Sequence, residues 1–214
     1  MKTDDLISQL TGDLKPVKSP ENAFVFALKW TIASFVLITV VISFLKPRAD
    51  LLATLQTAGM FGEILSFAAL LFASLLLVSW TSSPGRERRA IYSRFLFFVL
   101  AICALVNFFG IFGLSPELRA EGMDVLGSGC TLVALTVGIL TGAAFAYKVR
   151  QGASLNPFKS GLLVGLAALG AGGVAITLHC GNTNGMHILM WHFLVPLVAM
   201  VILGIVIGKK ILRW

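Results

Sequence analysis

Charged side chains are scarce in this sequence, and their scarcity excludes an ordinary soluble domain. Only 13% of the 214 residues are Asp, Glu, Lys or Arg, whereas 57% are hydrophobic. A typical soluble domain carries about a quarter charged residues. A strand pattern of alternating polarity is also absent, so helices are the expected way to satisfy the backbone within lipid. The sequence therefore predicts an all-α membrane protein.

Several catalytic motifs are missing as well. The chain has no Cys-x-x-Cys, no phosphate-binding loop, no His-Glu-x-x-His and no Gly-x-Ser-x-Gly. A thiol oxidoreductase usually needs a shuttling thiol pair, often Cys-x-x-Cys. The segments between the apolar runs are too short to hold a folded catalytic domain. We therefore expect that the protein is not an enzyme.

Ionisable groups are nearly absent from the apolar runs. Lys29 falls at one end of the first run, and Glu63 falls near an end of the second, where we expect it to reach the membrane interface. Ion-coupled transporters usually place ionisable groups near the bilayer midplane. The lack of such groups argues against a transporter.

Six apolar runs are long enough to cross a bilayer, which takes roughly 17–25 residues. They suggest a bundle of six transmembrane helices that occupies residues 25–214. Pro196 is expected to kink the last of them. The six expected spans are 25–45, 60–80, 92–113, 127–147, 159–178 and 188–208.

The basic residues orient this bundle. Fourteen of the seventeen Lys and Arg residues fall on one side of a six-span arrangement, and the other three are Lys46, Arg48 and Arg119. Because cytoplasmic loops are enriched in Lys and Arg, the N- and C-termini are expected in the cytoplasm. The same bias accounts for the net charge of +7 without direct binding of nucleic acid.

Residues 1–24 form the longest expected cytoplasmic segment, an amphipathic helix followed by a tether. Thr3 is a good N-cap, and Asp4 and Asp5 favour the positive end of a helix dipole. Pro16 limits the helix. Such a helix could dock on its own bundle, lie on the membrane or bind another protein in a groove. The apolar residues that share one face are Leu6, Ile7, Leu10 and Leu14.

Two of the three cysteines fall at the same outer rim of the predicted bundle. Cys130 begins the fourth run, and Cys180 lies in the turn after the fifth. Small residues at helical spacing, including Gly161 and Gly165, are expected to let these two spans approach closely. In an antiparallel pair, residues at equal depth have a constant sum of residue numbers. The matched pairs are Cys130 with Cys180, Gly138 with Gly172, and Gly142 with Ala168.

The outer rim also gathers soft and borderline metal ligands. Thiolate, imidazole and thioether groups suit zinc, copper or toxic thiophilic metals. The spacing matches no established zinc motif, so hydrogen-bonded structural histidines and packed cysteines are the alternative interpretation. We expect no cofactor other than a transiently bound thiophilic metal. The candidate metal ligands are Cys130, Cys180, His179, His187 and His192.

The two ends of the chain and the cysteine turn resemble the NrsF family of bacterial membrane anti-sigma factors. The resemblance spans the whole chain, but this chain has Trp191-His192 where the family has an aromatic pair. The segments that carry it are Met1-Lys-Thr-Asp-Asp-Leu-Ile7, Leu178-His-Cys180, Trp191 and Leu212-Arg-Trp214.

This resemblance implies an inner-membrane protein that holds an extracytoplasmic-function sigma factor inactive. It also implies that Cys130 and Cys180 respond to stress. An inner-membrane metal or solute transporter with an outer Cys/His/Met site remains the alternative. The residues that the resemblance assigns to sigma binding are Thr3, Asp4, Asp5, Leu6, Ile7 and Leu10.

Overall fold

The computed structural model describes residues 12, 21–82, 98–99, 101–102, 105, 128–152, 154 and 156–212. Within these ranges every regular element is a helix, as expected from the sequence. The elements are α2 (Ala23–Leu45), α3 (Leu51–Thr54), α4 (Ala58–Thr81), α7 (Ser128–Arg150), α8 (Pro157–His179), α9 (Gly185–His187), the π-helix η3 (Ile188–Leu194) and α10 (Val195–Lys210).

Five of the described helical segments are long and apolar enough to cross a membrane, which identifies a multi-pass membrane protein. They coincide within a few residues with five of the six expected spans. The sixth, 92–113, falls largely outside the described residues, as do residues 1–11 of the expected amphipathic helix. The candidate spans are Ala23–Leu45, Gly59–Thr81, Gly129–Arg150, Pro157–His179 and Gly185–Lys210.

Side-chain caps determine where several of these helices begin. The Asn22 side chain accepts a hydrogen bond from the backbone of Phe24, and Asn156 accepts one from Lys159. The hydroxyl of Thr57 does the same for α4. The first N–H groups of a helix have no partner within it, so each cap is worth about 1 kcal/mol.

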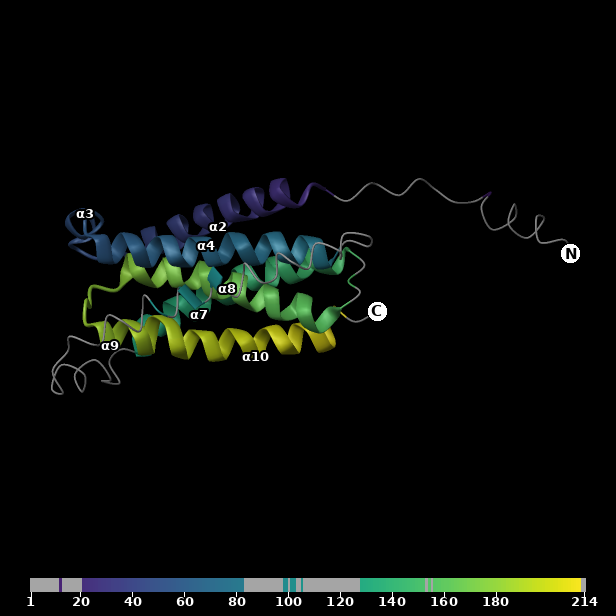
Figure 1. Cartoon of the computed structure of the whole chain (residues 1–214). Coiled ribbons are helices and arrows are strands. Elements are labelled where there is room, and N and C mark those ends of the chain that lie inside the picture. The colour runs from purple at the N-terminus through teal and green to yellow at the C-terminus, as the bar shows by residue number, and fades with distance from the viewer. Residues whose placement is uncertain are drawn as a thin grey trace, which may run out of the picture.

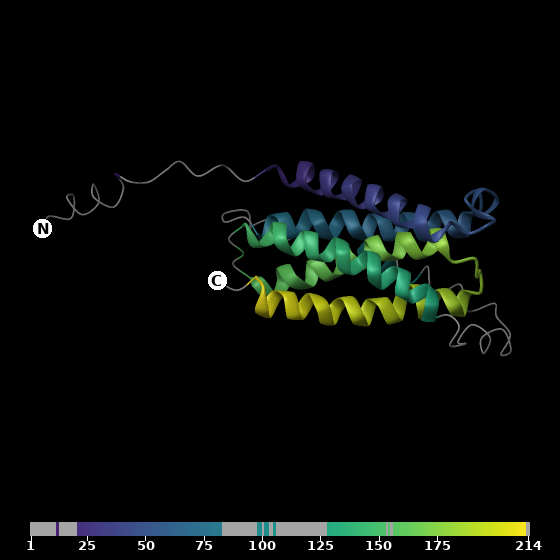
Figure 2. The same cartoon turned by 180° about the vertical axis from the view of Figure 1, so that it is seen from behind.

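Helix α8 is the central helix of the bundle. It packs against α4 on one side and against α7 and α10 on the others, while α2 lies on the outer face of α4 (Figure 1; Figure 2). Of the most apolar part of α8, 89% is buried within the protein. Outward-facing apolar residues of α2 and α10, such as Val36 and Ile202, are more than half exposed and suit contact with lipid.

Glycines let the neighbouring backbones approach α8. A Cβ atom on Gly172 would lie 2.3 Å from the carbonyl oxygen of Ala134 in α7, and one on Gly142 would lie 3.2 Å from the Cβ of Ala168. The antiparallel pair of α7 and α8 was therefore predicted correctly, although Gly172 faces Ala134 and not Gly138. Close approach of this kind is the usual basis of helix packing in membranes.

One part of the glycine prediction was wrong. Gly161 and Gly165 do not face α7. A Cβ atom on Gly161 would lie 2.4 Å from the carbonyl oxygen of Gly204, and one on Gly165 would lie 2.3 Å from that of Met200, both in the last span. A central helix has several neighbours, and the spacing of small residues does not determine which neighbouring helix packs against them.

The two ends of the bundle differ in content. Helices α3 and α9 lie at one end, and α2 begins and α10 ends at the other (Figure 1). Helix α4 ends where α2 begins, whereas α7 begins at the end that holds α3 and α9. The first residues of α7 and the last of α8 therefore meet beside α9, where the candidate site lies.

Candidate functional site

Cys130 and Cys180 meet at the α9 end of the bundle. Cys130 lies in the first turn of α7, and Cys180 is the residue that follows the last turn of α8. Their Sγ atoms are 3.0 Å apart, and both thiols are free. Cys180 is 3% exposed, whereas Cys130 is partly exposed. The sequence prediction that these two cysteines share one depth is confirmed.

His187 adds a third donor atom to this pair. Its Nε2 lies 3.4 Å from the Sγ of Cys180. The side chain of Asn184 caps α9 by accepting hydrogen bonds from the backbone of Met186 and His187, which fixes where this histidine stands. The donor atoms of Cys130, Cys180 and His187 all lie within 4.8 Å of one another.

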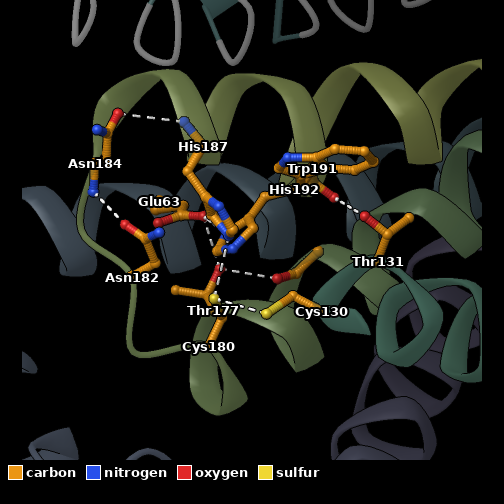
Figure 3. A network of polar contacts seen from close by, with 11 residues as sticks. Glu63, Cys130, Thr131, Thr177, Cys180, Asn182, Asn184, His187, Trp191 and His192 are labelled. Carbon is orange, nitrogen blue, oxygen red and sulfur yellow. Dashed lines mark hydrogen bonds and ion pairs between the residues drawn. The ribbon is translucent and has the colours of Figure 1, made fainter. Parts of the chain in front are cut away.

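The π-helix η3 brings His192 beside His187. Residues five apart in an α-helix point about 140° away from each other. A π-helix pairs residues five apart, so these two side chains share one face. The ring centroids are 5.5 Å apart in a T-shaped contact. Figure 3 shows both imidazoles on the side of the helix that faces Cys180.

Pro196 lies two residues after the end of this π-helix, in the first turn of α10. Proline has no N–H and cannot donate to the carbonyl four residues earlier, which is that of His192. The hydroxyl of Thr131 in α7 instead donates to the neighbouring carbonyl of Trp191 at 2.9 Å. The last span therefore has a π-helical register just before Pro196, and the hydrogen bond from Thr131 ties it to α7 next to Cys130. A kink at Pro196 stays a prediction.

Glu63 is a functional candidate that sequence reasoning misplaced. It does not reach the protein surface: the residue is 7% exposed, and its Oε1 accepts hydrogen bonds from Nδ1 of His192 at 2.8 Å and from the hydroxyl of Thr177 at 2.9 Å (Figure 3). Burial of a carboxylate is costly unless it is paired in this way. In the sequence, the signal for this pairing was a single acidic residue near the end of an apolar run, at the rim where the histidines also lie.

His179, the other histidine of the rim, lies apart from this cluster. Its Nδ1 is 2.9 Å from the carbonyl oxygen of Lys46, beyond the end of α2. Lys46 has a left-handed backbone with φ of 68°, which is unfavourable for a side-chain-bearing residue. The contact with His179 supports this turn.

Arg48 lies in the connector between α2 and α4 and contacts the chain on either side of Cys180. Its guanidinium pairs with both carboxylate oxygens of Asp50 and lies 3.4 Å from the carbonyl of Gly181, while its backbone N–H donates to Leu178. The hydrogen bond from Arg48 holds the pKa of Asp50 below its ordinary value. The chain on either side of Cys180 is therefore anchored to the α2–α4 connector.

The residues assigned to sigma binding cannot be placed in the same way. They lie outside the described residues, as does the third cysteine, Cys103. The site that the structure does describe is the cluster of Cys130, Cys180 and His187. Beside it, His192 contacts the ring of His187 and pairs with Glu63, which also accepts from Thr177.

Comparison with known proteins supplies the family. The profile described as "Negative regulator of sigma F" (NrsF) matches residues 10–214. A curated relative from Azospira oryzae, "Probable anti-sigma-F factor NrsF", is 26% identical over 216 residues and is covered completely, as is this chain. No solved structure matches the chain. The family is one of regulators and not of enzymes. The chain therefore belongs to the NrsF family of negative regulators of sigma F.

Proposed function

We propose that this protein is an anti-sigma factor of the bacterial inner membrane that binds an extracytoplasmic-function sigma factor, and that Cys130 and Cys180 control this binding. Its family supports negative regulation of a sigma factor. The observation that supports the switch is the 3.0 Å separation of two free thiols contributed by different helices. Bound at the membrane, the sigma factor is kept from RNA polymerase by occlusion.

The proposed orientation puts the thiols on the periplasmic side. Lys148, Arg150, Lys209 and Lys210 lie in the last turns of α7 and α10, at the end of the bundle opposite the cysteines. Positive charge of this kind favours the cytoplasm. The thiols then face an oxidising compartment, and the N- and C-termini face the sigma factor.

The proposed sigma-binding element is the N-terminal part of residues 1–24, which precede the membrane domain of residues 25–214. Thr3, Asp4 and Asp5 would begin a helix, and Leu6, Ile7 and Leu10 would supply its apolar face. An amphipathic helix of this length gains its stability from the groove it enters. Binding by this segment leaves the bundle free to act as anchor and sensor.

Oxidation is the proposed signal. The two thiols would lose two electrons and two protons to hydrogen peroxide, which is reduced to two water molecules, and a sulfur–sulfur bond of about 2.05 Å would form. The sulfurs would approach by about 1 Å, which pulls the start of α7 toward the end of α8. Because α8 contacts α4, α7 and α10, its displacement would reach the cytoplasmic end.

The size of the required effect is modest. A signal shifts an equilibrium only by its differential affinity for the two states. A difference of about 2–4 kcal/mol would change sigma-factor occupancy by roughly tens- to hundreds-fold. One disulfide and the repacking of one helix pair are sufficient to supply this energy.

A pull-down tests the sigma-binding assignment. The full chain, solubilised in detergent under reducing conditions, is expected to capture a sigma factor, and the chain lacking residues 1–14 is expected to lose it. Leu6→Asp should also lose it, whereas Val36→Ala, on a lipid-facing position of α2, should not. If the truncated chain captures the sigma factor as well as the full chain does, the N-terminal assignment is wrong.

A transporter with an outer metal-entry site is the second candidate, favoured only by the Cys130–Cys180–His187 cluster. The buried Glu63–His192 pair lies near the same end of the bundle, because Glu63 belongs to the second turn of α4 and His192 to η3. Uptake of zinc or cadmium into proteoliposomes would favour the transporter. Capture of a sigma factor without uptake would exclude it.

A further inference from the structure

The donor atoms at the rim have the spacing of a metal site. In a tetrahedral zinc site, Zn–S is about 2.3 Å and Zn–N about 2.0–2.1 Å, so neighbouring donors lie about 3.3–3.8 Å apart. The 3.4 Å between Cys180 Sγ and His187 Nε2 already falls in this range. The two sulfurs, 3.0 Å apart, need to separate by less than about 1 Å, which a small side-chain rotation supplies.

A fourth donor atom is buried and unused. The side chain of His192 is 2% exposed, its Nδ1 is engaged by Glu63, and its Nε2 has no hydrogen-bond partner among the residues that the structure describes. A buried polar atom without a partner is rare and destabilising. The π-helical register holds this ring against that of His187, on the face that looks toward Cys180 (Figure 3).

Glu63 sets the state of that fourth donor. With the carboxylate accepting at Nδ1, the proton of neutral His192 resides on Nδ1, and Nε2 keeps the lone pair that a metal requires. Thr177 holds the same carboxylate oxygen from α8. Metal-bound histidines commonly have such a carboxylate behind them, which fixes the tautomer and the ring orientation.

The donor atoms of Cys130, Cys180 and His187 lie within 4.8 Å of one another, and His192 stands outside this group of three. We propose that these three residues bind a divalent cation of the zinc class, Zn²⁺ or Cd²⁺, and that His192, oriented by Glu63, rotates toward the ion to complete a tetrahedral site. Two thiolates and two imidazoles match the S₂N₂ donor set of zinc. They do not suit Mg²⁺ or Ca²⁺, which require oxygen ligands. Two thiolates would also balance the double charge of the ion at a buried location.

The proposal that this site binds a metal ion depends only on the positions of its donor atoms. The proposal that the ion regulates the protein also depends on the proposed function. The same two sulfurs cannot ligate a cation and form a disulfide at once. An occupied site would therefore hold the chain in its reduced arrangement, and an oxidant would have to displace the ion. A metal ion and an oxidant then become opposing inputs to one pair of thiols.

Cobalt titration of the reduced full-length protein in detergent tests the site. We expect one Co²⁺ per chain with sulfur-to-cobalt charge-transfer and tetrahedral ligand-field bands, both abolished by one equivalent of Zn²⁺. Cys130→Ser or Cys180→Ser should remove the charge-transfer intensity of one thiolate and weaken binding. His187→Ala and His192→Ala should weaken binding without removing either thiolate band.

Two further variants separate the proposed roles. Glu63→Gln should weaken Zn²⁺ binding about 10–100-fold while the Co²⁺ spectrum remains that of an S₂N₂ site. His179→Ala is the matched control, because this histidine of the same rim contacts Lys46 and should leave the affinity unchanged. Circular dichroism and gel filtration of each variant show whether it has folded.

Two results would overturn the site. One is a wild-type protein that binds neither Co²⁺ nor Zn²⁺ when reduced. The other is a folded His192→Ala variant with wild-type affinity and spectrum, which would remove the fourth ligand. The titration needs no sigma factor, so capture of sigma without metal binding overturns the site alone, and metal binding without capture overturns the proposed function alone.

Discussion

The sulfur atoms of Cys130 and Cys180 lie 3.0 Å apart although 50 residues separate them in the chain. Cys130 is placed by the first turn of α7 and Cys180 by the end of α8, and the two helices are held together below by Gly172 and Ala134. The position of each thiol is thus a consequence of helix packing, and a change at the thiols acts back on that packing.

This proximity predicts fast and specific disulfide formation. In a Cys103→Ser background, mild oxidation of the detergent-solubilised protein should remove two free thiols per chain. Maleimide labelling followed by mass spectrometry counts them. Cys130→Ser and Cys180→Ser should each keep their remaining thiol under the same treatment. Intermolecular dimers in place of the internal bond would contradict the arrangement.

The close approach of α7 and α8 predicts a large effect of a single methyl-bearing side chain. Gly172→Val would place its Cβ atom 2.3 Å from the carbonyl oxygen of Ala134, so the helices must separate. We expect a loss of about 1–3 kcal/mol in the free energy of unfolding and slower Cys130–Cys180 oxidation. Gly59→Val in α4, which meets no atom within 4 Å, is the control for helix propensity. Denaturation in detergent and oxidation kinetics measure both, and equal effects of the two variants would refute the packing argument.

The buried Glu63–His192 pair predicts a much larger stability loss than an exposed pair does. Glu63→Ala leaves the buried His192 without its acceptor, whereas the Thr177 hydroxyl can still donate to the carbonyl oxygen of Gly173. Removal of one partner of a buried pair costs about 3–5 kcal/mol. Glu21→Ala removes the exposed pair with Lys29 and should cost less than about 1 kcal/mol. Unfolding in chelator-containing buffer excludes metal effects, and similar losses in both variants would show that Glu63 is not buried and paired.

The ion pair between Asp50 and Arg48 predicts that the stability it contributes is lost only under acid conditions. Hydrogen bonding by Arg48 lowers the pKa of Asp50 in the folded protein. Its stabilising contribution is therefore complete above the ordinary Asp pKa of about 3.9 and is lost as the pH falls through the lower folded value. Thermal unfolding of the wild type and Asp50→Asn should converge in that acid range and differ above it. A constant difference at every pH would rule out this linkage.

Five of the six expected spans and the meeting of the cysteines could be predicted from sequence because lipid imposes simple constraints. A helix must be long and apolar to cross, and antiparallel neighbours preserve depth, so Cys130 and Cys180 were bound to share a rim once their topology was known. These constraints do not determine which helix packs against a given pair of glycines. Gly161 and Gly165 carry the same spacing as Gly138 and Gly142, yet they meet α10.

The positions of His192 and Glu63 in the site could not be predicted, because they depend on a local change from α-helical to π-helical register. Five-residue spacing separates His187 from His192 on an α-helix, and only the π-helical turn before Pro196 brings them together. Glu63 was placed at the interface because it falls near a helix end. Its burial depends on His192 from the last span and Thr177 from α8, which the periodicity of α4 does not reveal.

The most direct test of the account is the affinity of the sigma factor for this protein in its two thiol states. The full chain is reconstituted in lipid nanodiscs, and binding is measured after reduction and after oxidation, with metal chelated throughout. We expect the oxidised form to bind roughly tens- to hundreds-fold more weakly, and the Cys130→Ser/Cys180→Ser variant to keep the reduced affinity after oxidant treatment. Equal affinity of the reduced and oxidised wild-type protein would contradict the central claim that these two cysteines control the hold on the sigma factor.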